Sequence, residues 1–221
     1  MKITKNLINH IEAEAKKHFK KASGCHDWTH TERVRNLALK IGRKEKADLG
    51  ILELAAFLHD ICKCEELKHK GKFCHAERGA KVARKILKKY GVDEETINAV
   101  SHCIIAHRTR NDYMPETIEA KILHDADKLD AVGAIGIVRN FMVATLIKTP
   151  VLYTGKEKKL ARSGACRDYT EDDTAILEYE IKLKHIKDRL FTKEARRIGR
   201  VRHEFMEMFL KRFWEEARAE K

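Results

Sequence analysis

The sequence predicts an all-α protein, and three observations support this fold class. Apolar residues recur at helical spacing along most of the chain, and no alternating run is long enough for a convincing strand. Only two prolines and eleven glycines interrupt the 221 residues, so long helices can form. Charged residues make up 36% of the chain, which suits helices with solvated outer faces, while 43% hydrophobic residues are enough for a core.

The first half of the chain predicts four helices. Apolar residues at helical spacing predict one helix over about 29–44, and the apolar run 51–58 predicts a buried second helix that continues into the residues after it. A third pattern covers about 75–90 and ends before Gly91, which is placed as a C-terminal cap. An Asp-Glu-Glu start then predicts a fourth helix, whose inner face also carries His107.

The second half predicts a long helix and a long loop. Pro115 opens a fifth helix that we expect to run to about Ile147, with a bend near Gly133 and Gly136. Residues 148–173 lose the helical pattern and are rich in glycine and basic side chains. We therefore expect a long basic loop there, which could be an ordinary exposed loop or a lid that closes over a polyanionic substrate.

The C-terminal tail predicts two further helices, near 174–190 and 193–218. We interpret four apolar residues of the second as its inner stripe: Ile198, Val201, Phe205 and Met208. Together these elements predict a single domain over residues 1–221, with its chemical motifs in 26–139 and its C-terminal helices in 174–218.

The net charge of +12, from 46 basic and 34 acidic residues, bears on the partners. Because the basic residues are interleaved with acids, the pattern favours a solvated surface and a small anionic substrate over a nucleic-acid-binding stripe. No secretory signal is visible, and the longest apolar stretch, 131–147, is too short and too polar for a membrane span. We therefore expect a cytoplasmic protein whose six cysteines are reduced. The spacing of Cys62, Cys64 and Cys74 does not favour a zinc knuckle.

Two histidines and an aspartate lie on inward-facing positions of the first two helices. His59-Asp60 follows the apolar run 51–58, so both side chains should be buried. A buried aspartate without a partner is very costly, and a metal ion would supply that partner. His30 begins the apolar face of the preceding helix, four residues before Val34.

The fifth helix adds two aspartates. Asp127 and Asp130 share a face with its apolar residues, and we expect Asp127 to be the buried one. Asp125 lies about 200° round the helix from Asp127, so a regular helix cannot aim both into one site. We therefore place His124-Asp125 outside the site, and His26-Asp27 at a helix start.

The ordered set His30, His59, Asp60 and Asp127 offers two imidazoles and two carboxylates. Such a mixed nitrogen and oxygen set, with positions left for water, suits Mn, Fe, Co, Ni or Mg better than a closed structural zinc site. For each residue alone, a hydrogen-bonded core side chain is the competing interpretation.

This order of residues resembles the H…HD…D pattern of the HD-domain metal-dependent phosphohydrolases. The matching segments are 28–34 (WTHTERV), 58–61 (LHDI) and 125–139 (DADKLDAVGAIGIVR). The last is similar to a branch of small bacterial and archaeal proteins typified by nucleotide pyrophosphohydrolases, in which a helical tail is also usual. The resemblance covers about residues 20–215, and it implies an HD-type helical bundle with the four residues above as ligands of a divalent metal ion.

The resemblance also implies roles for residues around the metal. In many HD enzymes a lysine at the position of Lys63 meets substrate phosphate, whereas the nucleotidase branch has a glutamate there, which argues against simple monophosphate hydrolysis. Arg33 is a second phosphate candidate, and His107 could bind phosphate or a second metal. Asp60 could also accept a proton, and Asp130 could orient a ligand or act as an acid or base. A solvated side chain at the helix end is the alternative for Lys63.

The reaction implied is hydrolysis of a phosphate ester or anhydride by attack of a metal-bound water. Within the branch, the expected substrate is a nucleoside triphosphate, split to monophosphate and pyrophosphate. Other phosphohydrolases, acting on a monophosphate, a cyclic nucleotide or polyphosphate, remain alternatives, as does a nucleotide- or RNA-binding module. We expect a small phosphorylated partner, no membrane and no nucleic acid, and a homodimer through the tail helices is possible.

Overall fold

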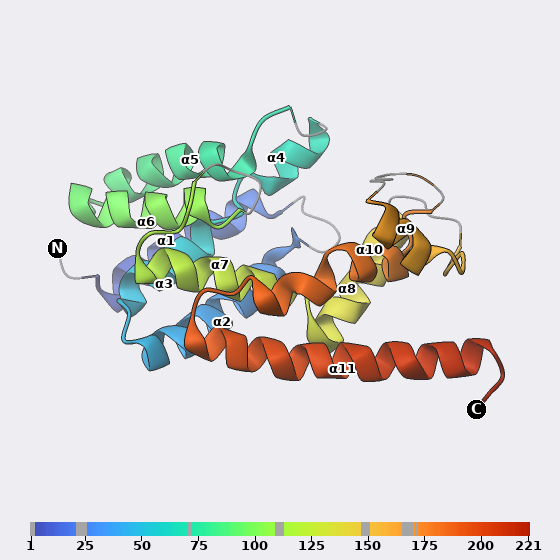
Figure 1. The fold of residues 1–221 in the computed structure, drawn as a ribbon. Helices are drawn as coiled ribbons and strands as arrows, with labels where there is room; N and C mark the ends of the chain where they lie inside the picture. Colours follow the sequence, from blue (N-terminus) through green and yellow to red (C-terminus); the bar gives the residue numbers. More distant parts are fainter. Residues whose placement is uncertain are drawn as a thin grey trace. The chain divides into compact units, whose positions relative to one another are not determined.

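Helices form the secondary structure of this computed structural model, which describes residues 3–20, 26–69, 72–108, 113–146, 151–164, 170 and 172–221 (Figure 1). No strand occurs among these residues, so the predicted all-α fold class is confirmed. They form two compact units, one made of Met1–Asp127 with Phe191–Ala195 and the other of Lys128–Leu190 with Arg196–Lys221. The expectation of a single domain over residues 1–221 stays a prediction.

The first unit contains the helices expected from the first half of the chain and two that the sequence pattern did not predict, one at the N-terminus and a short one after the His-Asp pair. Their bounds lie within a few residues of the predicted ones. The helices are α1 (Lys5–His18), α2 (Trp28–Glu45), α3 (Leu49–Leu58), α4 (Lys63–Lys68), α5 (His75–Lys89), α6 (Glu94–Ala106) and the greater part of α7 (Ile118–Asp130).

Aspartate side chains explain where three of these helices begin. Asp27, Asp48 and Asp93 precede α2, α3 and α6, and each carboxylate accepts a hydrogen bond from a backbone N–H of the first turn. Such a cap contributes about 1 kcal/mol by satisfying a donor that has no partner within the helix. Gly91 follows the C-terminal end of α5 and takes φ +71°, which supports the glycine cap predicted there.

Helix α3 forms the centre of the first unit. It packs against α1, α2 and α6, and nearly all of its side chains from Leu52 onward are buried. A helix that is apolar on every side gains most when neighbours surround it, at about 25 cal/mol for each Å² of apolar surface removed from water. Since α3 ends at Leu58, the next two residues, His59 and Asp60, lie buried in the interior of this unit.

The expected fifth helix is wrong as a single element. The structure has two helices, α7 and α8 (Gly133–Leu146), separated at Ala131 and Val132. Gly133 takes φ +82°, and a Cβ atom there would lie 3.0 Å from Cγ of Arg202. At Gly136 a Cβ atom would overlap the carbonyl group of Ala131. The two glycines therefore mark a break and a tight turn, where the sequence suggested a bend.

The second unit differs from the expectation in its loop and its tail. The segment 148–173, expected to be a loop, contains the helix α9 (Glu157–Ser163), while 148–150, 165–169 and 171 lie outside the described residues. The helix expected near 174–190 is divided into α10 (Ala175–Ile181) and the 3₁₀-helix η2 (Leu183–Asp188). The long last helix, α11 (Lys193–Ala217), agrees with the prediction.

The predicted inner stripe of α11 is largely wrong. Val201, Phe205 and Met208 are 58%, 42% and 61% exposed, and Ile198 alone of the four is buried. The other buried positions, Ala195, His203 and Met206, lie on a different side of the helix, and Ile198 lies between this side and the exposed stripe. Periodicity identifies an apolar stripe, but it does not say that the stripe faces the interior.

A membrane span requires a long and apolar helix, and the described helices differ from this requirement. None is both long and apolar enough to cross a membrane by itself, and α7 with α8 meets the test only as a bent pair.

Candidate metal centre

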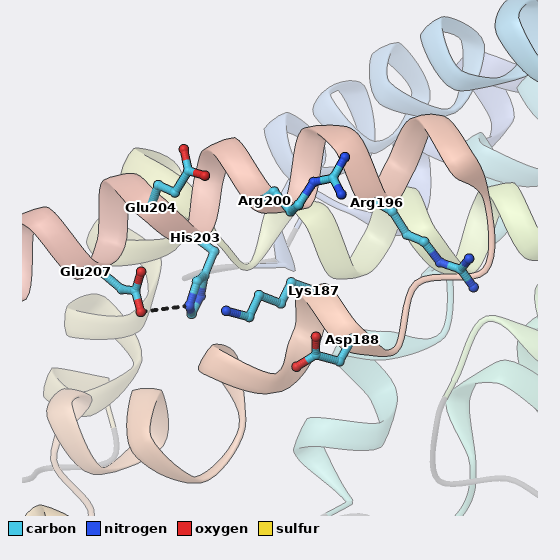
Figure 2. A pocket seen from close by; sticks show the side chains of 7 residues that line it. All are labelled: Lys187, Asp188, Arg196, Arg200, His203, Glu204 and Glu207. Carbon is cyan, nitrogen blue, oxygen red and sulfur yellow. Dashed lines mark ion pairs between the residues drawn. The ribbon is translucent and has the colours of Figure 1, made fainter.

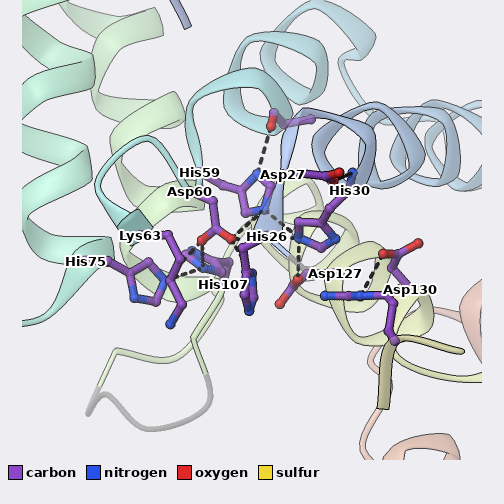
Figure 3. Close-up of polar contacts among 12 residues, drawn as sticks. His26, Asp27, His30, His59, Asp60, Lys63, His75, His107, Asp127 and Asp130 are labelled. Carbon is purple, nitrogen blue, oxygen red and sulfur yellow. Dashed lines mark hydrogen bonds and ion pairs between the residues drawn. The ribbon is translucent and has the colours of Figure 1, made fainter. Parts of the chain in front are cut away.

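The ends of several helices bring histidine and aspartate side chains together in the first unit (Figure 3). His30 lies in the first turn of α2, His59 and Asp60 follow the last turn of α3, and Asp127 lies on α7. Two further histidines join them: His75 is the first residue of α5, and His107 follows the last residue of α6. Helix ends are suited to this, because a side chain there can enter the core without interrupting the packed face of its helix.

The four ligands expected from the sequence lie close together. Nε2 of His30 is 3.4 Å from Nε2 of His59 and 3.4 Å from Oδ1 of Asp127. Oδ2 of Asp60 lies 3.8 Å from Nε2 of both histidines. His30, His59 and Asp60 are buried, whereas the Asp127 side chain is 17% exposed and so forms the edge of the cluster that solvent reaches.

Asp60 also joins a second group on its other oxygen. Oδ1 of Asp60 is 3.2 Å from Nε2 of His75 and 3.6 Å from Nε2 of His107, and these two nitrogens are 3.2 Å apart. His26 extends the first group, because its Nδ1 lies 3.0 Å from Oδ2 of Asp60. Three overlapping groups therefore have donor atoms close enough to hold a metal ion: His30 with His59 and Asp127, Asp60 with His75 and His107, and His26 with His30 and Asp60.

Hydrogen bonds on the far side of two rings set the tautomers. Nδ1 of His59 lies 2.8 Å from the carbonyl oxygen of Ala56, and Nδ1 of His107 lies 2.6 Å from that of Ile104. A carbonyl oxygen only accepts, so each Nδ1 carries the hydrogen and each neutral ring presents a lone pair at Nε2. Both lone pairs point into the cluster, toward carboxylate oxygens and other ring nitrogens. A buried set of acceptors that face one another calls for a cation between them, so the residues fit a divalent metal ion.

The pKa shifts favour the same charge state. Burial lowers the pKa of His59 to about 4, against the opposing effect of Asp60, so this ring is neutral near pH 7. Burial likewise lowers the pKa of His107. For Asp60, burial acts to raise the pKa, but its interactions with His59 and with the other histidines around it outweigh burial and hold the pKa well below its usual range. Neutral imidazoles beside an ionised carboxylate are the forms that bind metals.

A buried glutamate supports the second group. Glu66 accepts hydrogen bonds from Nδ1 of His75 at 2.9 Å, from Nζ of Lys63 at 2.6 Å and from Nη1 of Arg108 at 2.6 Å. Burial acts to lower the pKa of His75, but its hydrogen bonds to Asp60 and Glu66 prevail and raise it. Glu66 thus holds the orientation of the His75 ring while Nε2 of that ring faces Asp60.

Other expected residues occupy definite positions. Lys63 contacts Glu66, as described, and the half-buried Arg33 donates to Oγ1 of Thr29 at 3.0 Å. Asp130 belongs to the second unit, where its buried carboxylate pairs with Nη1 of Arg139 at 2.7 Å. The roles expected for Lys63, Arg33 and Asp130 in substrate binding or proton transfer stay predictions.

The expectation for the aspartates of α7 needs a correction. Asp125 is the fully buried one, and Asp127 is partly exposed. The Asp125 carboxylate accepts from the backbone N–H groups of Phe191 and Thr192 and from the Thr192 hydroxyl. The buried Asp125 carboxylate therefore anchors the segment before α11. Asp125 belongs to none of the three metal-competent groups.

Three neighbours of the cluster were not assigned to the site from the sequence. His26 lies before the first turn of α2, outside any periodic pattern, and Asp27 takes the expected capping role. His75 carried a usable signal, since it shares a face with the small buried residues Gly79 and Ala83 at four-residue spacing. Glu66 lies in a charged stretch of α4 with no signal of burial.

The second unit has a polar pocket of about 520 Å³ (Figure 2). It is lined by Lys187, Asp188, Arg196, Arg200, His203, Glu204 and Glu207. The three cations are balanced by three carboxylates, and Nε2 of its one histidine, His203, lies 3.2 Å from Glu207. Among the described residues, this pocket has no group of histidine, cysteine and acidic side chains close enough to hold a metal ion.

Comparisons with known proteins agree with the geometry of the first unit. Residues 27–132 match the HD domain family. The chain is 35% identical over 193 residues to the uncharacterized protein YpgQ of Bacillus subtilis, covering 86% of this chain and 83% of YpgQ. The crystal structure of YpgQ in complex with ADP has a TM-score of 0.73 at 30% identity and covers 95% and 94% of the two chains.

A second solved structure extends the comparison. An HD-superfamily hydrolase from Bacillus thuringiensis has a TM-score of 0.73 at 29% identity, covering 97% of this chain and 98% of its own. The likeness therefore includes the C-terminal helices as well as the segment with the His and Asp residues. The chain belongs to the HD-domain superfamily and is a metal-dependent hydrolase of that family.

Proposed function

We propose that this hydrolase cleaves nucleoside triphosphates to a monophosphate and pyrophosphate, with a divalent metal ion held by His30, His59, Asp60 and Asp127. The observation that carries the metal site is the convergence of buried acceptors: two ring nitrogens lie 3.4 Å apart between two carboxylates. The choice of nucleotide is supported by YpgQ, whose crystal structure contains ADP and is 30% identical to this chain in the structural comparison.

The metal would be Mn, Fe, Co, Ni or Mg, because histidine nitrogens and carboxylate oxygens suit these ions. When bound, the ion would acidify a water molecule and oppose the negative charge of the phosphoryl group. The protein supplies the ligands in the correct protonation state. The hydrogen bond from His59 to the Ala56 carbonyl keeps the Nε2 lone pair aimed inward, and Asp60 stays ionised.

The residues at the edge of the cluster would bind and orient the substrate. Asp127 is partly exposed and marks the side that a phosphoryl group can approach. Lys63, with its ammonium group held at Glu66, would oppose charge that develops on the phosphate. His26 shares a hydrogen bond with Asp60 and is 27% exposed, so it would hold a proton at the boundary between the cluster and solvent.

Arg33 and Asp130 have supporting parts in this proposal. Arg33 lies one turn after His30 on α2 and would contribute positive charge toward a phosphate. Asp130 follows Asp127 by one turn of α7 and would orient that part of the chain through its ion pair with Arg139. His107 would serve either substrate phosphate or a second ion shared with Asp60 and His75.

The test is a nucleotide panel with separate detection of orthophosphate and pyrophosphate, run on metal-free protein and on protein loaded with each metal in turn. We expect turnover only with metal, and pyrophosphate as a product from triphosphates. Orthophosphate alone would reject pyrophosphate release and favour another phosphohydrolase activity. Nucleotide binding without any turnover would favour a binding module and reject the enzymatic proposal.

A further inference from the structure

Glu66 holds two cations from different segments of the chain. Lys63 is the first residue of α4, and Arg108 lies two residues after α6. Both donate to the same carboxylate, each at 2.6 Å. The Glu66 side chain is 5% exposed, while those of Lys63 and Arg108 are 15% and 23% exposed. The carboxylate is thus the buried centre of the group, and the two cations reach from it toward solvent.

The charges of this group do not cancel. Two permanent cations share one carboxylate, which leaves an excess of one positive charge before His75 is counted. Most of their N–H donors bind none of the residues that the structure describes: Arg108 binds Glu66 and the Cys74 sulfur through Nη1 alone, and Lys63 uses one of its three ammonium hydrogens. Within the described part of the chain, Nη2 and Nε of Arg108 donate to no other residue.

The pair lies directly beside the candidate metal centre. The His75 ring bridges the two, with Nδ1 at 2.9 Å from Glu66 and Nε2 at 3.2 Å from Asp60. Figure 3 shows Lys63 beside His75. One imidazole therefore separates the cations from the carboxylate that would bind the metal, a spacing that places them next to a phosphoryl group at the metal.

We propose that Arg108, together with Lys63, binds a second phosphoryl group of the substrate, adjacent to the one at the metal. This inference rests on the proposed phosphohydrolase function, and it assigns Arg108 as a residue that selects substrates with two or more linked phosphates. The guanidinium group offers paired, planar donors that match phosphate oxygens, while Lys63 adds a point charge. A monophosphate would reach the metal but leave these donors unused.

A structural salt bridge is the competing explanation, and the chain supplies a matched control. Arg78 on α5 pairs with Glu65 on α4 at 3.0 Å, with side chains 49% and 46% exposed. This pair involves the same short helix, α4, and an arginine, but it makes no contact with His75 or Glu66 in the described structure. Arg78→Ala therefore reports the effect of losing an arginine–glutamate bridge from this helix without touching the proposed phosphate site.

The experiment measures binding of inorganic pyrophosphate by calorimetry to metal-free and metal-loaded protein, and KM and kcat for ATP. We expect Arg108→Ala to weaken pyrophosphate binding in both forms and to raise KM for ATP by about tenfold or more, with kcat changed far less. Arg108→Lys should recover part of the affinity, because it keeps the charge without the paired donors. Arg78→Ala should match the wild type.

Failure of this inference is separable from failure of the proposed function. If the wild type turns over ATP and Arg108→Ala keeps the same KM and pyrophosphate affinity, the inference is wrong and the function stands. If no nucleotide is hydrolysed but pyrophosphate binding still depends on Arg108, the function is wrong and the phosphate site stands. Absence of pyrophosphate binding to the wild type would overturn the inference. Should Arg108→Ala fail to fold, the pyrophosphate affinity and the KM for ATP of Arg108→Lys test the inference: the affinity should be lower and the KM higher than in the wild type, and unchanged values would overturn it.

Discussion

The cluster of the first unit and the pocket of the second are both built from histidines and charged side chains, yet they differ in how donors and acceptors are matched. Three cations and three carboxylates line the pocket, and His203 is paired with Glu207 (Figure 2). In the cluster, ring lone pairs and carboxylate oxygens converge, and no lysine or arginine belongs to the three metal-competent groups found among the described residues (Figure 3). Buried hydrogen-bond acceptors in excess of donors therefore indicate a metal site, whereas the presence of histidine alone does not.

The largest effect should come from Asp60, which, like His30, belongs to two of the three metal-competent groups. Asp60→Ala is expected to remove the metal and to lower turnover by about 10³-fold or more, since both the ion and an ionised contact are lost. Elemental analysis of the purified variant and the ATP assay measure these two effects. His203→Ala in the pocket is the control and should keep both metal and turnover. Loss of metal in His203→Ala instead would break the contrast between the two regions.

Two aspartates on α7 should separate metal binding from folding. Asp127→Ala is expected to lose metal with little change in stability, because its side chain is partly exposed. Asp125→Ala should keep metal affinity while losing about 2–3 kcal/mol of unfolding free energy, since it leaves the buried N–H groups of Phe191 and Thr192 without their acceptor. Urea unfolding and metal titration of both variants test this. Loss of metal in Asp125→Ala and not in Asp127→Ala would show that Asp125, and not Asp127, is the metal ligand.

The metal-free protein should lose stability as the pH falls from about 6.5 to about 4. The folded-state pKa of His59 is about 4, below its usual value, so the unfolded chain binds a proton in this range before the folded protein does. Stability therefore rises with pH across this window. His59→Gln, which has no titrating ring, should show a smaller change between pH 4.5 and 7 in denaturant unfolding. An equal change in both proteins would show that His59 does not contribute.

The smallest effect concerns the break between α7 and α8. Gly133→Ala should destabilise the protein by about 1 kcal/mol, because φ is +82° and the new methyl group would press on the Arg202 side chain. Gly91 also has a positive φ but no neighbour within 4 Å of a Cβ atom, so Gly91→Ala isolates the backbone contribution. Unfolding midpoints compare the two variants. Metal content should be unchanged in both, and its loss in Gly133→Ala would connect the break to the metal centre.

Periodicity predicts most helices of the first unit, and it leads to the four central residues, whose side chains lie close together in the structure while their role as ligands stays a prediction. His30, His59 and Asp127 follow the apolar faces of their helices, and those faces converge. Two neighbours of the cluster escape this reasoning: His26 precedes α2, and the buried Glu66 lies in the short helix α4, whose mostly charged sequence has no apolar face that indicates burial. The outward-facing apolar stripe of α11 shows the same limit, since periodicity finds a stripe without showing what it packs against.

Anomalous diffraction from crystals of the manganese-loaded protein tests the central claim most directly. We expect an anomalous peak bounded by His30 and His59 on one side and Asp60 and Asp127 on the other, and a further peak at Asp60, His75 and His107 would show a second ion. The pocket around His203 should show none. A manganese peak in that pocket and an empty His30–Asp127 cluster would contradict the account.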